Sequence, residues 1–402
     1  MLKKIIALII TICLISSLSV FNASAVEIAT EIVVLENYEQ YNSTSSNFSE
    51  KSSVNLNTLR NRLFNAIYNG EQSVSILDFN IKTQEVFIVS NVMNNMPEIL
   101  NAVDGFQYSY YTSGPLSGII DDIYFYYNCN KATFQQMYND FENAATQMTA
   151  DLINCNLTNV QKLLVLHDRL ALKCEYSTYK LQNNLLTFKE YSAYGALVMG
   201  DAVCQGYAEA YQYLLEKIGI ESILCNSQEI NHVWNIVYIN GNSYHIDVTW
   251  DDPVFNNPYS KPDGYVQHTN FLLSSDALFN NYKDGNDVGS HISYDYITEP
   301  QDTFFDNFFW REFTTAFSYQ NGKMYYSNSK LFKEKDLIIS NGFGDVNGDG
   351  DINAVDITSC RNLIYSENIG NIAGFRAFDV NSDSEINVLD IIRFKRLISY
   401  LG

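Results

Sequence analysis

The spacing of apolar residues changes along the chain, and each spacing predicts a different kind of element. From Tyr207 to Ile218 apolar side chains recur every three or four positions, which predicts a helix that begins near Cys204 and ends before Gly219. Alternating, β-rich runs on both sides of Asn240-Gly241 predict a hairpin with a two-residue turn. The same patterns predict helices at 59–68, 91–103, 133–153 and 158–170, strands at 73–77, 85–89, 106–111, 119–127 and 269–273, and a second Asn-Gly hairpin at 319–326.

The hairpin register brings a histidine and a carboxylate together. A two-residue turn at 240–241 places His232 opposite Thr249. Side chains two apart on a strand share a face, so Asp247 becomes a diagonal neighbour of His232 on the same side. His245 shares this face and is the alternative imidazole, although it lies nearer the turn. A three-residue loop would reverse one strand's parity and remove the contact.

Cys204 is the candidate nucleophile for this pair. It lies at a predicted helix start, where unpaired backbone N–H groups and the positive end of the helix dipole favour thiolate over thiol. The alternative is a cysteine that only fills space in the core. A nucleophile needs a base and the base needs an orienter, and His232 and Asp247 supply those residue types. His167, His268 and His291 are expected to be structural.

Composition and charge restrict the function classes. The chain has 46 acidic and 25 basic residues, with a formal charge of −21, which argues against a nucleic-acid partner. The cysteines show no C-x-x-C spacing, so a zinc site is not expected and most should be free thiols. Residues 1–25 have a basic start, an apolar run and Ala23-Ser24-Ala25, which predicts a cleaved secretory signal. The alternative, a membrane anchor, would need a longer apolar run.

Several motifs together resemble a known enzyme family. They are Ala193 to Ala208 around Cys204, His232-Val-Trp-Asn235 and Tyr244 to Pro253, with Leu166-His-Asp-Arg-Leu170 and Asn270 to Ser274 on either side. These segments resemble bacterial secreted transglutaminase-like domains over about residues 155–300. The resemblance implies a papain-like α+β fold, in which a helix bearing the cysteine packs on an antiparallel sheet.

The same resemblance implies a reaction class. Cys204 would attack a carbonyl to form a thioester, His232 would act as base and then acid, and Asp247 would orient the imidazole. Water as acceptor gives hydrolysis of a protein or peptide amide, whereas an amine gives transamidation of a glutamine side chain. Animal transglutaminases carry Trp after the nucleophile, but this chain has Gln205, so the oxyanion donors and the acceptor are left open.

The last part of the chain contains a duplicated acidic loop. Residues 345–356 and 379–390 are related by a shift of 34 positions, and both match the ligand spacing of an EF-hand calcium loop. Two structural calcium ions are therefore expected, and no cofactor is expected for catalysis. The expected ligands are Asp345, Asn347, Asp349, Asp351, Asn353 and Asp356 in the first loop, and Asp379, Asn381, Asp383, Glu385, Asn387 and Asp390 in the second. Ser384 replaces the glycine that normally permits a left-handed turn, so the second site should be weaker.

The loop pair resembles a dockerin, the calcium-dependent module that binds cohesins of a cellulosome scaffold. Each loop ends in Asp and is followed by a single predicted helix. The resemblance covers about residues 343–402 and implies a small all-α module. It also implies that a set of residues contacts cohesin: Ala354, Val355, Arg361, Val388, Leu389, Lys395 and Arg396.

The sequence therefore predicts a secreted, extracellular cellulosome subunit without a membrane span after signal cleavage. Its expected parts are the signal at 1–25, an extension or separate domain at 26–154, the catalytic core at 155–300, a hairpin appendage and linker at 301–342, and the dockerin at 343–402. One alternative is a catalytically inactive binding module delivered by the dockerin. A glycoside hydrolase is disfavoured because no convincing pair of carboxylates is evident.

Overall fold

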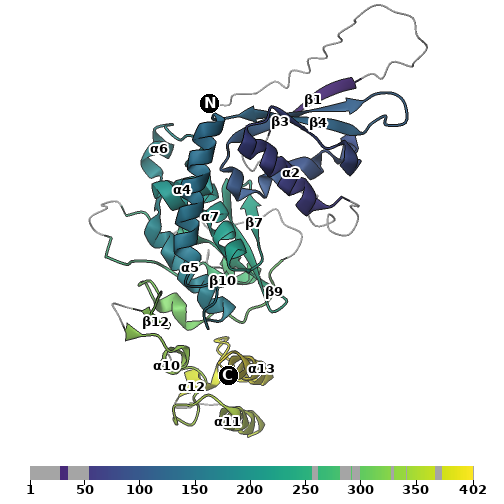
Figure 1. The fold of residues 1–402 in the computed structure, drawn as a ribbon. Helices are drawn as coiled ribbons and strands as arrows, with labels where there is room; N and C mark the ends of the chain where they lie inside the picture. Colours follow the sequence, from purple (N-terminus) through teal and green to yellow (C-terminus); the bar gives the residue numbers. More distant parts are fainter. Residues whose placement is uncertain are drawn as a thin grey trace, which may run out of the picture.

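A computed structural model describes residues 28–34, 54–255, 261–280, 291, 299–326, 330–340, 342–366 and 374–401. The predicted signal peptide lies outside these ranges. Within them, every helix is too short or too polar to cross a bilayer. The expected fold class is confirmed: helices are combined with antiparallel sheets, and a small helical module follows (Figure 1).

The N-terminal part is built on a sheet with the strand order β1-β3-β4-β2. The predicted hairpin of aromatic strands is confirmed, because β3 and β4 pair antiparallel from Val103↔Tyr127 to Tyr110↔Ile120. Its elements are β1 (Ile28–Val34), α2 (Leu56–Asn69), β2 (Ser73–Ser75), α3 (Phe87–Asn94), β3 (Val103–Tyr111), β4 (Ile120–Tyr127) and α4 (Lys131–Thr149), with 3₁₀ turns at Leu77–Phe79, Thr83–Glu85 and Pro97–Ile99.

Two predictions in this part were wrong. The strand expected at 85–89 is the end of a 3₁₀ turn followed by α3, whose buried Val89 and Met93 are four residues apart. The helix expected at 91–103 ends at Asn94 and gives way to a 3₁₀ turn that starts at Pro97. Proline disfavours helical geometry in the residue before it, which explains the early end.

The central part packs helices against the antiparallel sheet β10-β9-β8-β7. Helix α7 lies against β7 and β8 (Figure 1). The elements are α5 (Asn159–Lys173), β5 (Glu175–Tyr176), α6 (Thr178–Gln182), a π-helical turn (Gly195–Met199), β6 (Asp201–Ala202), α7 (Cys204–Lys217), β7 (Ser222–Ser227), β8 (His232–Ile239), β9 (Asn242–Ile246), α8 (Val248–Asp251), β10 (Phe271–Leu273) and α9 (Ser275–Asn280). Buried side chains of this part and of the N-terminal sheet belong to the same apolar cluster.

The C-terminal part begins with a 3₁₀ turn (Phe309–Glu312) and the predicted small hairpin. Its elements are β11 (Ser318–Gln320), β12 (Lys323–Tyr326), β13 (Lys330–Leu331), α10 (Glu334–Ser340), α11 (Ala354–Tyr365), α12 (Phe375–Phe378) and α13 (Val388–Leu401). Helices α11 and α13 follow the two acidic loops, as expected. They lie at the opposite end of the molecule from β1, β3 and β4 (Figure 1).

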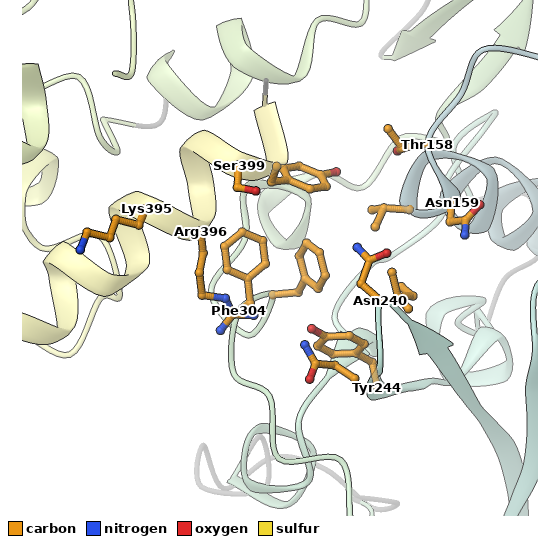
Figure 2. A pocket seen from close by; sticks show the side chains of 13 residues that line it. Thr158, Asn159, Asn240, Tyr244, Phe304, Lys395, Arg396 and Ser399 are labelled. Atoms are coloured by element: carbon orange, nitrogen blue, oxygen red, sulfur yellow. The ribbon is translucent and has the colours of Figure 1, made fainter. Parts of the chain in front are cut away.

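The last helix, α13, docks onto the segment that precedes this hairpin. Arg396 pairs with Asp302 at 2.6 Å, and the guanidinium groups of Arg393 and Arg396 lie 4.4 and 4.5 Å from the centroid of the Phe304 ring. Tyr400 packs against the same ring. Figure 2 shows the cleft of about 590 Å³ beside this contact, with α13 on one side and Asn240, Tyr244, Thr158 and Asn159 on the other.

Candidate functional site

Cys204 is the first residue of α7, as predicted, and its side chain is half-buried. The preceding residue, Val203, provides no side-chain cap, so the first-turn N–H groups of this helix have no capping side chain. The helix ends where expected, with Gly219 at a φ of 76°. Its N-terminal end therefore presents the thiol beside a positive dipole end.

The position of α7 is fixed by close contacts on both sides. A Cβ added at Gly206 would lie 2.8 Å from both the Ala202 Cβ and the Ser192 carbonyl oxygen, so no larger residue fits without displacement. On the sheet side, the Asn235 side chain donates a hydrogen bond to the Ala208 carbonyl at 3.0 Å. Because Asn235 lies on the same strand as His232, this bond ties the cysteine helix to the histidine strand.

The hairpin register is as predicted up to the end of β9. Asn240 and Gly241 both have positive φ, at 51° and 83°, as a type I′ turn requires, and Ile239 pairs with Asn242. The expected pairing of His232 with Thr249 is wrong, because β9 ends at Ile246 and His232 pairs with Ser227 on β7 instead.

Asp247 leaves the strand because it caps α8. Its Oδ1 accepts a hydrogen bond from the Trp250 backbone N–H at 3.2 Å. The structure nevertheless brings His232 and Asp247 together, since the His232 Nε2–H donates to Asp247 Oδ2 at 2.6 Å. Cys204 lies close enough to His232 to raise the pKa of its imidazole.

The charges around His232 favour its protonated form. Burial by itself lowers the pKa of this imidazole, but the Asp247 carboxylate and then Cys204 raise it to about 10. Burial would raise the pKa of Asp247, yet the neighbouring His232 and His291 hold it well below its usual range. The His232 ring also stacks on Trp234 and Trp250, at centroid distances of 5.7 and 5.0 Å, and aromatic faces stabilise a cation.

Two tyrosines lie close to the thiol. The pKa of Tyr176 and that of Tyr191 are both raised, first by burial and then by the electrostatic interaction with Cys204. Gln205, which follows Cys204, donates from its amide to Glu209 Oε1 at 2.8 Å along the same helix. Its side chain is thus held on α7 as a helix-start residue.

The other sequence-nominated histidines are held in hydrogen bonds elsewhere. His245 accepts from Trp234 Nε1 and donates to Ser275 Oγ, and burial lowers its pKa to about 3. His167 donates to Asp168 at 2.7 Å and to Asp251 at 3.1 Å, and His268 also faces Asp168, at 3.0 Å. The expectation that His167 and His268 are structural agrees with these buried contacts.

The sequence predicts a structural role for His291 but does not indicate which residues it contacts. In the structure its Nε2 lies 2.9 Å from Asp247 Oδ2. Irregular sequence around it gives no register from which this contact could be derived. The available signal was a histidine within fifty residues of Asp247, which is a weak signal.

Among the residues that the structure describes, two buried groups contain side chains of metal-ligating type: His167, Asp168 and His268, and His232, Asp247 and His291. In both groups the imidazole nitrogens that approach the aspartate are at hydrogen-bonding distance, so hydrogen bonds account for the clusters without a metal. All six cysteines in the described part of the chain are free thiols.

The two acidic loops have the donor set that calcium prefers. In the first, Asp345 accepts hydrogen bonds from the backbone of Gly348, Asp349 and Gly350, which folds the loop around that carboxylate. Asp379 does the same in the second loop with Asp383 and Ser384. The carboxylates at the last loop position, Asp356 and Asp390, are buried. Carboxylate and amide oxygens curled in this way fit a hard cation such as Ca²⁺.

The second loop is strained at two positions, one more than predicted. Ser382 and Ser384 have φ values of 60° and 67°, where the first loop has Gly348 and Gly350. A non-glycine residue in the left-handed region costs about 1 kcal/mol or more. The structure thus adds Ser382 to the reasons for a weaker second site.

Some of the residues predicted to contact cohesin are exposed, and others contact side chains of this chain. Val355, Val388 and Leu389 are exposed at 54%, 60% and 52%, and Ile392, four residues after Val388 on α13, is also exposed. Ala354 begins α11, and Arg361 lies over the Tyr365 ring on the same helix. Lys395 is exposed, whereas Arg396 is engaged with Asp302 and Phe304.

Comparison with known proteins confirms the C-terminal module. Residues 343–399 match the dockerin type I domain, which is the class of module that anchors proteins in cellulosome-type assemblies. No curated protein matches the chain. A solved structure described as "Crystal structure of a TGase" is similar, with 14% identity and a TM-score of 0.25, over 42% of this chain and 51% of that one. The chain thus spans about half the length of that structure.

Proposed function

We propose that the central part is a cysteine enzyme of the transglutaminase-like class that acts on protein or peptide amides through a thioester. The observation that carries this is the placement of His232, which contacts Cys204 and, through Nε2, Asp247. An imidazole bound on both sides can hold a proton taken from the thiol and deliver it to a leaving group. This proton transfer requires a protonated His232, and the Asp247 carboxylate and the ring faces of Trp234 and Trp250 favour that form.

The reaction follows from these positions. The Cys204 thiolate attacks the amide carbonyl carbon, a C–S bond forms, and the carbonyl oxygen becomes an oxyanion beside the start of α7. Collapse of this intermediate breaks the C–N bond while the His232 imidazolium gives its proton to the leaving amine. Neutral His232 then takes a proton from water or from an acceptor amine, which attacks the thioester and releases the thiol. Asp247 keeps the imidazole oriented throughout.

The C-terminal module would place this chemistry in a larger assembly. We infer that the predicted signal directs secretion and that the dockerin, with calcium in both loops, binds a cohesin module of a scaffold protein. The exposed apolar side chains of Val355, Val388, Leu389 and Ile392 support this docking role. The protein would then act outside the cell, as part of a polysaccharide-degrading complex, on proteins that this complex encounters in its substrate.

The test is mass spectrometry of casein incubated with the calcium-loaded chain and a labelled primary amine. Cleaved peptides identify hydrolysis of the backbone, amine adducts identify transamidation, and deamidated glutamines identify side-chain hydrolysis. Cys204→Ala should abolish every product, whereas Cys155→Ala, which removes another half-buried thiol, should leave them unchanged. Substrate binding without any product, retained in Cys204→Ala, would instead identify an inactive binding module.

A further inference from the structure

The Asp247 carboxylate is held by a second histidine. The Nε2–H groups of His232 and His291 both donate to the same oxygen, Oδ2, at 2.6 and 2.9 Å. The other oxygen, Oδ1, accepts from the Trp250 backbone. Asp247 and His291 are each only 1% exposed, so water does not replace these donors.

Aromatic rings hold His291 in this position. Its ring centroid lies 4.0 Å from that of Trp250 and 4.7 Å from that of Trp234. The same two tryptophans stack on His232. Both imidazoles are therefore fixed in one aromatic enclosure and directed at one carboxylate oxygen.

A carboxylate with a single donor can rotate about its Cβ–Cγ bond and present either oxygen. In Asp247 both oxygens accept hydrogen bonds, and Oδ2 accepts one from His291 in addition to the one from His232. The carboxylate therefore cannot rotate freely, and the position of the oxygen that binds His232 is fixed. We propose that His291 is a positioning residue of the Cys204–His232–Asp247 site, which holds Asp247 in the orientation that orders His232. This inference rests on the proposed function and extends the site from three side chains to four.

The groups around His291 are consistent with a neutral donor. Burial lowers its pKa, and Asp247 opposes that effect. The charge of His232 on β8 lowers the pKa of His291 further, and the charge of Asp251 on α8 raises it. His291 in turn lowers the pKa of His245 on β9, and Asp247 raises the pKa of Tyr176 on β5. A neutral His291 donates to the carboxylate without competing with the His232 cation for its charge.

The experiment measures alkylation of Cys204 by iodoacetamide between pH 4 and pH 10 in the calcium-loaded full chain, following the Cys204 peptide by mass spectrometry. It requires no substrate. His291→Phe keeps a ring between the tryptophans but removes the donor, whereas His291→Gln keeps an N–H donor and removes the ring. We expect His291→Phe to react about tenfold more slowly at pH 5, since a hydrogen bond to a charged group is of that order, with its acid limb displaced to higher pH. His291→Gln should stay near the wild type.

Melting temperatures separate this role from a structural one. If His291 only fills space, His291→Phe will keep the wild-type alkylation profile and His291→Gln will lose stability, and the inference is overturned. Asp247→Asn provides the second comparison. A displaced profile for Asp247→Asn with an unchanged one for His291→Phe rejects only the role of His291. Unchanged profiles in both variants reject the proposed Cys204–His232–Asp247 site itself.

Discussion

Asp247 accepts a 2.6 Å hydrogen bond from His232 although the two residues do not face each other in the sheet. The strand pairing of β8 with β9 stops at Asn235↔Ile246, and Asp247 reaches His232 from the N-cap position of α8. The Asp247 side chain is thus fixed through Oδ1 by the helix cap, which leaves Oδ2 free to accept hydrogen bonds from imidazoles.

This pair should make the stability of the protein depend on pH. The folded pKa of His232, about 10, lies above its ordinary value of about 6.5. Its stabilising contribution is therefore fully present below about pH 6.5 and lost as the pH rises through 10. The contribution of Asp247, whose pKa is lowered, is present above its ordinary value and lost as the pH falls below it.

Urea unfolding of the wild type and of Asp247→Asn at pH 6, 8 and 10.5 measures this effect. We expect the free-energy difference between the two proteins to shrink across that series, because His232 loses its charge. A difference that stays constant from pH 6 to pH 10.5 would show that the imidazole is not held as a cation by Asp247.

Gly206→Ala should disturb the site through the backbone. The added methyl group would lie 2.8 Å from Ala202 Cβ and from the Ser192 carbonyl, so α7 or its neighbours must shift. Overpacking of this kind costs about 1–3 kcal/mol. We expect a lower melting temperature together with slower alkylation of Cys204.

Gly219→Ala is the matched control for that variant. No atom lies within 4 Å of an added Cβ there, but φ is 76°, so the substitution strains only the end of the helix. It should lower stability while leaving Cys204 reactivity unchanged. Equal loss of reactivity in both variants would mean that reactivity follows stability and not the position of the helix start.

Calcium binding should be unequal in the two loops. Ser382 and Ser384 occupy left-handed positions that glycines fill in the first loop, and each costs about 1 kcal/mol. Calorimetric titration should resolve a tighter and a weaker site. Ser382→Gly and Ser384→Gly should each tighten the weaker one by about fivefold. Two equal sites in the wild type, or a tighter second site, would contradict this explanation.

Arg396 should join the dockerin to the rest of the protein. Its salt bridge to Asp302 is partly exposed and therefore contributes little, and its contact with Phe304 adds a cation–π term, so Arg396→Ala should cost about 1 kcal/mol. Hydrogen exchange in α13 should increase. The exposed neighbour Lys395→Ala should show neither change.

Cohesin binding by the same two variants tests the expected interface. If Arg396 serves the intramolecular contact, Arg396→Ala will retain cohesin affinity while α13 becomes more mobile. A large loss of affinity with unchanged exchange would assign Arg396 to the partner surface instead, as the resemblance to dockerins implied.

Local patterns in the sequence were enough for the elements of the site. The apolar spacing after Cys204 predicted α7, Asn240-Gly241 predicted the turn, and the duplicated loop predicted the calcium-binding module. These features depend on residues close together in the chain, where helix periodicity, glycine conformations and ligand spacing act directly. The same local reasoning failed at 85–89, because a short apolar run fits a helix as well as a strand.

Tertiary structure decided the contacts that no local period encodes. His291 reaches Asp247 from 44 positions away, and its place depends on the packing of Trp234 and Trp250. The docking of Arg396 on Asp302 joins residues 94 positions apart. Sequence thus determined which residue types stand at the start of a helix and along a hairpin. Packing across the chain determined which further side chains complete the site, since burial and ring contacts are properties of the folded core.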